Sequence, residues 1–159
     1  MVMDKNESKK LTESSDLRGI EISELKGKFE RCVNQLCIRD SLLLKLDVSE
    51  RAIAHKLAEY LQCEFPDWNV DCEYNRMTDS VKIRSTTKRP FTPDIVVHRR
   101  NNVGNLIIIE VKKSGRRKND EIQRLQEALE YPFNYKLGIY VMFCTSKSYE
   151  TRPTIQYIY

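Results

Sequence analysis

Two carboxylates and a lysine stand at the borders of two strongly apolar segments. Asp94 precedes an Ile-Val-Val run, and Glu110 follows the four aliphatic residues 106–109, with Lys112 two positions further on. Side chains alternate faces along a strand, so Glu110 and Lys112 should point to one side and Val111 to the other. Such charges at the end of a buried strand are costly unless they are paired or bound to a ligand. The pattern therefore indicates a ligand site or a structural ion pair, Asp94–Lys112 or Glu110–Lys112.

The elements that must position these residues are two strands, over 91–98 and 105–113, joined by the polar turn 99–105. Four consecutive aliphatic residues are typical of a strand that is covered on both faces. If the two strands are antiparallel, we expect their polar ends to meet only through an offset pairing or a bend in the strands.

Pro93-Asp94, fifteen intervening residues and then Glu110-Val111-Lys112 resemble the signature of the PD-(D/E)xK nuclease superfamily. The context supports the resemblance: an acidic helix lies upstream, an amphipathic helix and a strand lie downstream, and the match covers residues 47 to 143. The resemblance implies an α/β (α+β) restriction-endonuclease-like core, with a central mixed β-sheet of about four to five strands flanked by helices.

The resemblance also implies an activity: an Mg²⁺-dependent endonuclease-type hydrolase that cuts phosphodiester bonds, in DNA rather than RNA. Mg²⁺ prefers one or two carboxylates, waters and substrate phosphate as ligands, and Asp94 and Glu110 supply two carboxylates. Mn²⁺ should substitute for it. The superfamily pattern adds the backbone carbonyl of Val111 as a metal ligand and gives Lys112 a catalytic role toward the attacking water and the transition state. As a general base, Lys112 would need a lowered pKa.

An acidic helix precedes the motif. Asp47-Val-Ser-Glu50 fits a capping box, with Asp47 as the N-cap and Glu50 at the third helical position, and the helix is expected to run to about Cys63. In the superfamily a carboxylate on the first core helix often joins the metal site, and Glu50 is the matching position. We therefore expect Glu50 to be a catalytic residue and metal ligand; the alternative is a cap alone.

Three further polar residues are weaker candidates. Glu73 and Arg76 end a half-buried strand over 68–74, and they either pair with each other or reach the site, with structural pairing favoured. Gln126 lies on a helix expected over 119–130. The resemblance gives some members a polar residue there that touches substrate or water; the alternative is an ordinary exposed glutamine.

Cations bracket the acidic stretch, as a metal site that must hold a polyanion requires. Each cluster alone would also fit a solvated turn. The clusters are Lys82, Arg84, Lys88 and Arg89 before the site, Arg99 and Arg100 in its turn, and Lys112, Lys113, Arg116, Arg117 and Lys118 after it. From these we select as nucleic-acid-binding residues Lys88, Arg89, Lys113, Arg116 and Arg117. The segment 77–90 should form a long hairpin or loop that touches substrate.

Composition limits the class of protein. A chain of 159 residues with net charge +4 suits one domain, over 20–159, after a flexible polar lead over 1–19. We find no apolar run that could span a bilayer and no signal peptide, so we expect a cytoplasmic protein without a membrane partner. Five cysteines, an odd number without C-x-x-C spacing, favour reduced and mostly packed thiols.

The remaining segments complete the expected fold. They are a helix over 21–38, a segment ambiguous between strand and helix over 42–46, an interior strand over 137–143 parallel to the Glu110 strand, and a tail over 149–159 that adds an edge strand or docks on a partner. Cutting both strands of DNA usually needs two active sites, which predicts a homodimer through the first helix or the tail. The alternative function is a catalytically silent nucleic-acid-binding or accessory, regulatory domain on the same fold.

Overall fold

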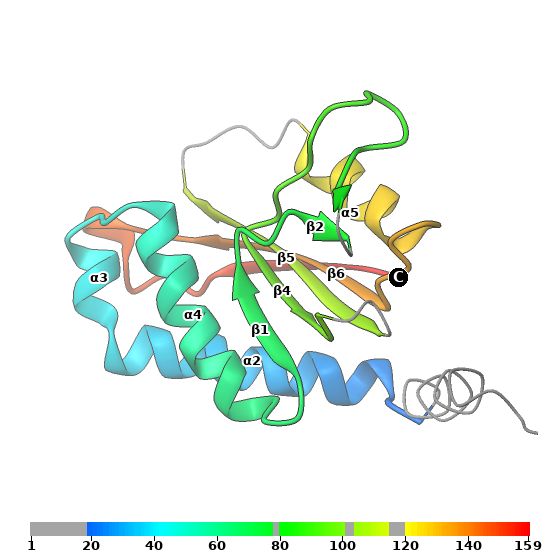
Figure 1. Ribbon diagram of the computed structural model, residues 1–159. Helices are drawn as coiled ribbons and strands as arrows, with labels where there is room; N and C mark the ends of the chain where they lie inside the picture. The colour runs from blue at the N-terminus through cyan, green and yellow to red at the C-terminus, as the bar shows by residue number, and fades with distance from the viewer. Residues whose placement is uncertain (1–18, 78–79, 101–103, 115–119) are drawn as a thin grey trace, which may run out of the picture.

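A five-stranded mixed sheet forms the middle layer of the computed structural model, which describes residues 19–77, 80–100, 104–114 and 120–159. Its strand order is β1-β4-β5-β6-β7 (Figure 1). The bounds are β1 (Asn69–Cys72), β4 (Ile95–His98), β5 (Asn105–Lys113), β6 (Leu137–Phe143) and β7 (Thr154–Ile158). The predicted mixed sheet of four to five strands flanked by helices is thereby confirmed.

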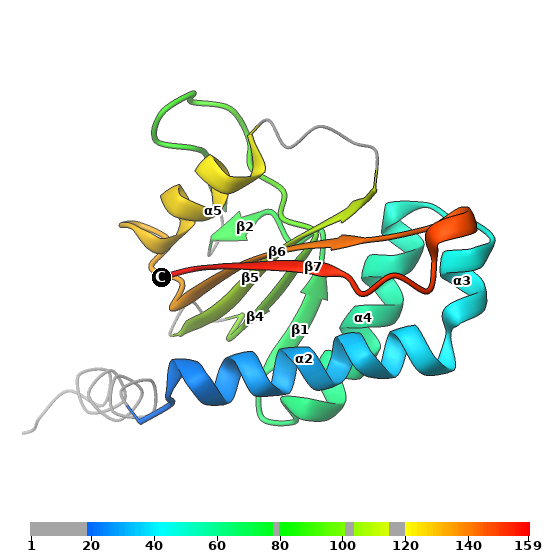
Figure 2. The ribbon, with the colours of Figure 1, turned by 180° about the vertical axis from the view of Figure 1, so that it is seen from behind.

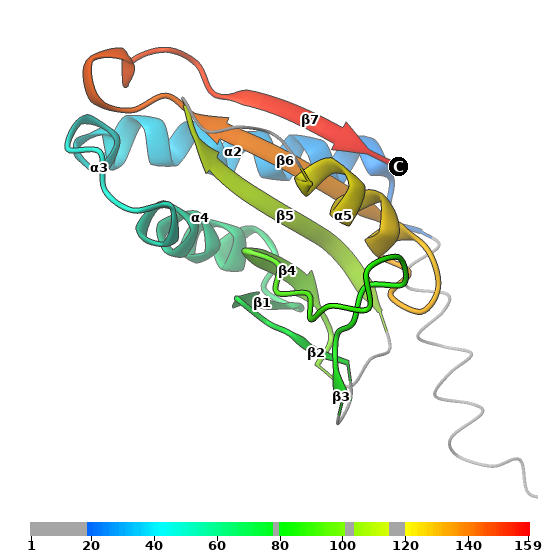
Figure 3. The same cartoon turned by 90° about the horizontal axis from the view of Figure 1, so that it is seen from above.

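Helices cover both faces of the sheet. They are α2 (Ile22–Arg39), α3 (Ser41–Lys45), α4 (Glu50–Glu64) and α5 (Glu121–Leu129), with a short 3-10 turn η1 (Ser146–Ser148). The long helices α2 and α4 lie against one face and α5 against the other (Figure 3). The ambiguous segment 42–46 is helical, as part of α3.

The sheet topology agrees with the crossover expected from the sequence. β5 and β6 are parallel and are joined through α5, whereas β4 pairs antiparallel with both β1 and β5. The tail adds β7 as an antiparallel edge strand beside β6 (Figure 2). The parallel strand over 137–143 was correctly predicted, and of the two alternatives for the tail the structure shows the edge strand.

The two faces of β5 explain its unbroken apolar run. Ile107, Ile109 and Val111 pack in the core beneath α2 and α4, whereas Ile108 packs in the smaller core beneath α5. A strand covered on both faces needs aliphatic side chains at every position. Glu110 and Lys112 share the parity of Ile108, so they lie on the α5 face, and Val111 points away from them as predicted.

A hairpin on the α5 side precedes β4. Its strands β2 (Arg76–Met77) and β3 (Ser80–Val81) form a separate two-stranded sheet, and a bridge between Ile83 and Pro90 closes the following turn. The expected hairpin over 77–90 is therefore present. The burial of its side chains is unexpected, because the charged Lys82 and Arg84 are buried whereas the apolar Ile83 is half exposed.

The predicted capping box at the start of α4 is wrong. Ser49 is the N-cap, its hydroxyl oxygen accepting a hydrogen bond from the backbone N–H of Ala52 at 3.2 Å, and Glu50 is the first helical residue. Asp47 has a left-handed backbone, φ 54°, and its carboxylate accepts from Lys113 Nζ at 2.8 Å. The turn at Asp47 delays the helix by two residues, and the carboxylate expected to cap it binds the strand end instead.

Other expectations concern the surroundings of the fold. No helix in the described ranges is both long and apolar enough to cross a membrane. The five cysteines are free thiols, as predicted, although Cys63 and Cys72 are exposed rather than packed. The polar lead over 1–19 lies, except for Gly19, outside the described residues.

Candidate active site

Asp94 and Glu110 are brought together by the register of β4 and β5. The pairs Ile95–Ile109 and Val96–Ile108 continue by one residue to place Asp94 opposite Glu110. In an antiparallel pair the start of one strand lies beside the end of the other, so neither an offset nor a bend is needed. The expectation of an offset or bend was therefore wrong; the register shift lies at the other end of β4.

Asp94 is fixed to the end of β5. Its Oδ2 accepts a hydrogen bond of 2.7 Å from the backbone N–H of Val111. The N–H and C=O of a strand residue point toward the same neighbour, so the Val111 carbonyl also faces the side on which β4 begins. Oxygen atoms of Asp94, Glu110 and the Val111 carbonyl are thus placed where they could bind one cation.

Glu110 is almost completely enclosed, with 2% of its surface exposed. Its Oε2 accepts from Arg124 Nη2 at 3.0 Å. Its Oε1 is buried and has no hydrogen-bond partner among the described residues. Buried polar atoms in native proteins are nearly always bonded, so an unbonded carboxylate oxygen marks a position suited to a ligand.

Both carboxylates resist ionisation in this environment. Burial raises the pKa of Glu110 to about 8, the neighbouring Asp94 charge adds to the effect, and Arg124 and Lys112 oppose it. Burial also raises the pKa of Asp94, against the opposing effect of the Val111 N–H. Two such acids side by side would ionise more readily with a cation between them.

Lys112 lies between two further carboxylates. Its Nζ is 3.6 Å from Glu50 Oε2 and 3.5 Å from Glu121 Oε1, which are its salt bridges in the described part of the chain. Burial lowers the pKa of Lys112, but the carboxylates of Glu50, Asp94, Glu110 and Glu121 outweigh burial and raise it. The lysine is therefore an ammonium at neutral pH and lacks the lowered pKa that a general base would need.

Glu50 reaches the cluster from the opposite layer. As the first residue of α4 it projects toward the end of β5, where its Oε1 accepts from the backbone N–H of Lys113 at 3.2 Å. Its Oε2 faces Lys112. The structure thus places Glu50 beside the motif, as the resemblance implied, although it is not the cap-box residue that the sequence suggested.

Two residues of α5 belong to the cluster and were missed in the sequence. Arg124 bonds Glu110, and its Nη2 is also 3.7 Å from Glu121 Oε1. From sequence, Glu121 and Arg124 resemble an ordinary exposed pair three residues apart. The available signal was their place beside the buried Leu125, because a helix that crosses over β5 must carry its flanking residues toward the strand end.

The weaker candidates lie elsewhere. Glu73 forms its ion pair with Arg51, at 2.9 Å, rather than with Arg76. Arg76 is exposed on β2, and Gln126 is exposed on α5. The backbone N–H of Glu73 donates to the carbonyl of Asp94 at 3.0 Å, but the side chains of these three residues take no part in the hydrogen bonds and ion pairs described for the Asp94–Glu110 cluster.

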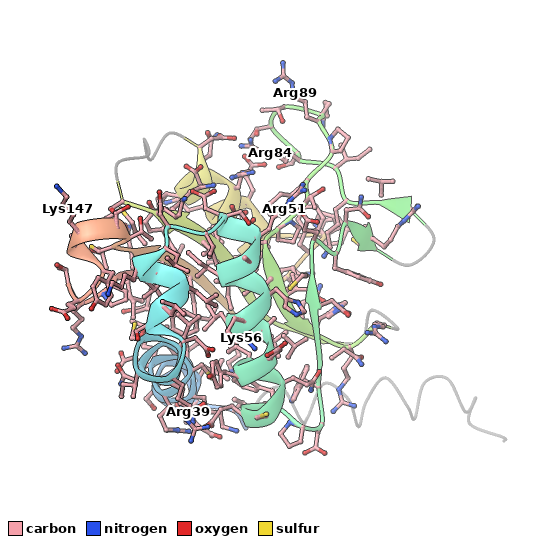
Figure 4. All side chains as sticks on the ribbon, turned by 90° about the vertical axis from the view of Figure 1, so that its left-hand side faces the viewer. Arg39, Arg51, Lys56, Arg84, Arg89 and Lys147 are labelled. Carbon is pink, nitrogen blue, oxygen red and sulfur yellow. The ribbon has the colours of Figure 1, made fainter. Side chains whose placement is uncertain are left out.

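The predicted cationic clusters divide into buried and exposed parts. Arg84 bonds Glu127 at 2.7 Å and also pairs with Asp120, while Lys82 donates to the Tyr135 hydroxyl at 2.8 Å. Lys88 and Arg89 are exposed, and Figure 4 shows Arg89 at the outer tip of the turn, above Arg84 and Arg51. Lys113 pairs with Asp47. Arg116 and Arg117 lie outside the described residues.

The donor set fits a two-carboxylate magnesium site better than a closed protein cage. Within the described ranges, no three His, Cys, Asp or Glu side chains are grouped so that they could hold a metal ion by themselves. Mg²⁺ commonly uses one or two carboxylates and takes its other ligands from water and phosphate. Asp94, the unbonded Oε1 of Glu110 and the Val111 carbonyl meet that requirement.

Comparison with known proteins identifies no relative: no protein-family model matches the chain, and neither the curated proteins nor the solved structures give a significant match. The structure itself establishes a mixed five-stranded sheet with helices on both faces. The resemblance of the motif to PD-(D/E)xK nucleases therefore remains a prediction, and the chemistry of the site has to be argued from its residues.

Proposed function

We propose that the chain is a metal-dependent nuclease that hydrolyses phosphodiester bonds, with DNA as its substrate, on a core of the restriction-endonuclease-like type. One observation carries the proposal. Asp94, Glu110 and Lys112, together with Glu50 from the other layer, converge at the end of β5, and Glu110 keeps a buried oxygen without a partner among the described residues. A buried carboxylate oxygen without a hydrogen-bond partner is costly to keep, which suits a position that receives a ligand.

Asp94, Glu110 and the Val111 carbonyl would hold Mg²⁺, or Mn²⁺ as a substitute, and Glu50 lies close enough to the motif to act as a further ligand. A divalent ion at this position would supply Lewis-acid stabilisation of the phosphate and would lower the pKa of a bound water. The residues supply two acids that would gain from a shared cation. Burial raises the pKa of both, the Asp94 charge further raises the pKa of Glu110, and the Glu50 charge further raises the pKa of Asp94.

Lys112 acts in this proposal as a fixed positive charge. Its ammonium lies on the same face of β5 as Glu110, and the carboxylates of Glu50 and Glu121 hold it in place. A preorganised cation stabilises the negative charge that develops on phosphoryl oxygens. The neighbouring carboxylates keep Lys112 protonated in the metal-free protein, which suits this charge-stabilising role.

Exposed cations on two segments of the chain support a polyanionic substrate. Lys88 and Arg89 occupy the exposed turn on the α5 side, and Arg51 lies on the first turn of α4, next to Glu50 (Figure 4). Phosphate contacts from such residues supply affinity that does not depend on sequence and that weakens with salt. This arrangement supports nucleic acid as the substrate.

The second candidate is a catalytically silent nucleic-acid-binding or accessory domain. It is favoured by the internal pairing of the cluster, because Arg124 already neutralises one oxygen of Glu110 and Lys112 already contacts two carboxylates. Such a domain would bind DNA in a salt-sensitive manner and would not cut it, whichever metal is supplied.

A homodimer belongs to the proposal wherever both strands of a duplex are cut. The α2–α3 corner carries three exposed aliphatic side chains spaced four residues apart, Ile38, Leu42 and Leu46. These exposed aliphatic side chains suit a contact between two copies of the chain. Separately, the free thiols suit a location in the cytoplasm. Light scattering of the wild type and of Leu42→Glu measures this directly: the expected dimer should dissociate in the variant.

The nuclease assay uses labelled single-stranded and duplex DNA with Mg²⁺, Mn²⁺ or EDTA. We expect cutting with either metal and none with EDTA, and we expect Asp94→Ala and Glu110→Gln to abolish it. Glu64→Gln is the matched control, because Glu64 also bonds an arginine, Arg31, at 2.8 Å but lies at the end of α4 remote from Glu50. Cutting that persists in both site variants would overturn the proposal; binding without cutting in every metal would favour the silent domain.

A further inference from the structure

Arg124 presents a buried donor that the fold itself does not use. Its Nη2 contacts Glu110 Oε2 at 3.0 Å, but its Nε lies 4.0 Å from Asp120 Oδ2, beyond hydrogen-bond distance. In the described part of the chain, the buried side-chain atoms without a hydrogen-bond partner are Arg124 Nε and Glu110 Oε1. A donor and an acceptor are thus both unpaired within one bonded pair of residues.

One kind of ligand that would complete this pair carries both signs of charge. Glu110 Oε1 can accept from a donor or bind a cation, whereas Arg124 Nε can donate to an acceptor such as an oxyanion. A divalent cation bound to a phosphate group satisfies both atoms together. The planar guanidinium also matches the geometry of phosphate oxygens better than an ammonium does.

We propose that Arg124 is the residue that binds the substrate phosphate in this site, and that it exchanges Glu110 for a phosphate oxygen when a divalent cation binds. This inference rests on the proposed nuclease function and adds to it. Glu110 would hold the cation through Oε1 and would then no longer need Arg124 as its counter-charge. The guanidinium of Arg124 would be free to donate to a phosphate oxygen and to neutralise the substrate.

The surroundings of Arg124 keep it directed at the site during this exchange. Glu121 and Asp120 lie three and four residues before it on the same side of α5, at 3.7 and 4.0 Å from its guanidinium. Asp120 also pairs with Arg84, whose other partner is Glu127. The same group of ion pairs therefore connects Arg124 to the turn that carries the exposed Lys88 and Arg89.

A purely structural role for Arg124 predicts different behaviour. If the guanidinium served only to neutralise Glu110, its removal would change stability and metal affinity but not the affinity for DNA once metal is bound. The two roles are therefore separated by measuring DNA binding and metal binding independently.

The experiment measures fluorescence anisotropy of a labelled duplex with Ca²⁺ in place of Mg²⁺, over a range of salt, and the melting temperature with and without Mn²⁺. For Arg124→Gln we expect DNA binding about tenfold weaker or more, a salt slope lower by about one phosphate contact, and a retained Mn²⁺ stabilisation. Arg124→Lys should keep the salt slope but lose several-fold in affinity. Arg31→Gln is the matched control, since Arg31 forms a comparable pair with Glu64.

Each outcome is decisive. Wild-type DNA affinity and salt slope in Arg124→Gln, with Mn²⁺ stabilisation present, would overturn this inference and leave the nuclease proposal intact. If Arg124→Gln does not fold, wild-type affinity in Arg124→Lys would overturn it equally. If the wild-type chain shows neither Mn²⁺ stabilisation nor DNA binding, the proposed function fails and the inference fails with it.

Discussion

β4 connects two charged clusters that differ in how their charges are satisfied. At its start, Asp94 and Glu110 lie with Lys112 and Arg124, and two buried atoms of that cluster lack partners within the described residues. At its end, His98 bonds Asp71 at 2.9 Å, and Arg100 bonds the same carboxylate at 2.6 Å. The first cluster therefore keeps buried polar atoms without hydrogen bonds, whereas the carboxylate of the second cluster is bonded by two side chains.

The pKa values of the acids move in opposite directions. Hydrogen bonding from Arg100, reinforced by His98, lowers the pKa of Asp71 despite its burial. Burial raises the pKa of Glu110 to about 8, and Arg124 only partly offsets it. A carboxylate with a lowered pKa stabilises the fold at neutral pH, whereas one with a raised pKa destabilises it. The comparison supports a structural role for Asp71 and agrees with the ligand-binding role proposed for Glu110.

The largest expected effect separates the two clusters by activity. Asp94→Ala and Glu110→Ala should reduce metal-dependent cutting by about a thousandfold or more, because each removes a metal ligand. Asp71→Asn should cut at a rate close to that of the wild type. Initial rates on labelled DNA measure this, and a comparable loss in Asp71→Asn would erase the distinction between the clusters.

Unfolding experiments should give the reverse order. Asp71→Ala leaves His98 and Arg100 without their shared acceptor and should cost about 3 kcal/mol of unfolding free energy. Glu110→Gln removes a buried charge and, with EDTA at pH 8, should be at least as stable as the wild type. Urea denaturation followed by circular dichroism tests both, and a strongly destabilised Glu110→Gln would place Glu110 among the structural residues.

The pH dependence of stability should show the same contrast. The raised pKa of Glu110 means that the folded state holds its proton between about pH 4.5 and pH 8 while the unfolded state does not. The unfolding free energy of the metal-free protein should therefore fall as the pH rises through this window, by about 1.4 kcal/mol for each unit by which the pKa is raised. The contribution of Asp71, with its lowered pKa, should be present above pH 3.8 and lost below it. Melting curves of the wild type and Glu110→Gln check this, and identical slopes in the two proteins would contradict it.

The smallest effect distinguishes the neighbours Ser49 and Glu50. Ser49→Ala removes the N-cap hydrogen bond of α4 and should cost about 1 kcal/mol without changing the Mn²⁺ response. Glu50→Gln should leave the helix intact and reduce the stabilisation by Mn²⁺. Thermal melts with and without Mn²⁺ measure both, and an undiminished Mn²⁺ response in Glu50→Gln would remove it from the metal site.

The sequence was sufficient to predict a mixed sheet flanked by helices and to predict that several polar residues lie close together. The apolar run before Glu110 predicts a strand covered on both faces, and the segment 137–143 predicts its parallel neighbour, because these patterns depend on burial that the chain itself encodes. The resemblance to a known motif then indicated which polar residues lie close together. Asp94 is found beside Glu110, and Glu50 is found beside Lys112.

Features that depend on a partner from elsewhere in the chain were not predictable in this way. Lys82 and Arg84 were grouped with the exposed cations that precede the site. They are buried instead, because Tyr135 and Glu127 on distant segments provide the hydrogen-bond acceptors that they need. Arg124 looked like a surface residue because its place beside the buried Leu125 is the one local signal, and that signal does not identify Glu110 as its partner. Asp47 fitted a cap by spacing alone, and only the turn at its backbone and the proximity of Lys113 exclude that role.

The central claim is that Asp94 and Glu110 share a divalent cation. Anomalous diffraction from crystals grown with Mn²⁺ tests it most directly. We predict a peak bonded to Asp94 and to Glu110 Oε1, lost in Glu110→Gln. Crystals grown in saturating Mn²⁺ that show no anomalous peak at this position, with Glu110 still bonded only to Arg124, would contradict the account.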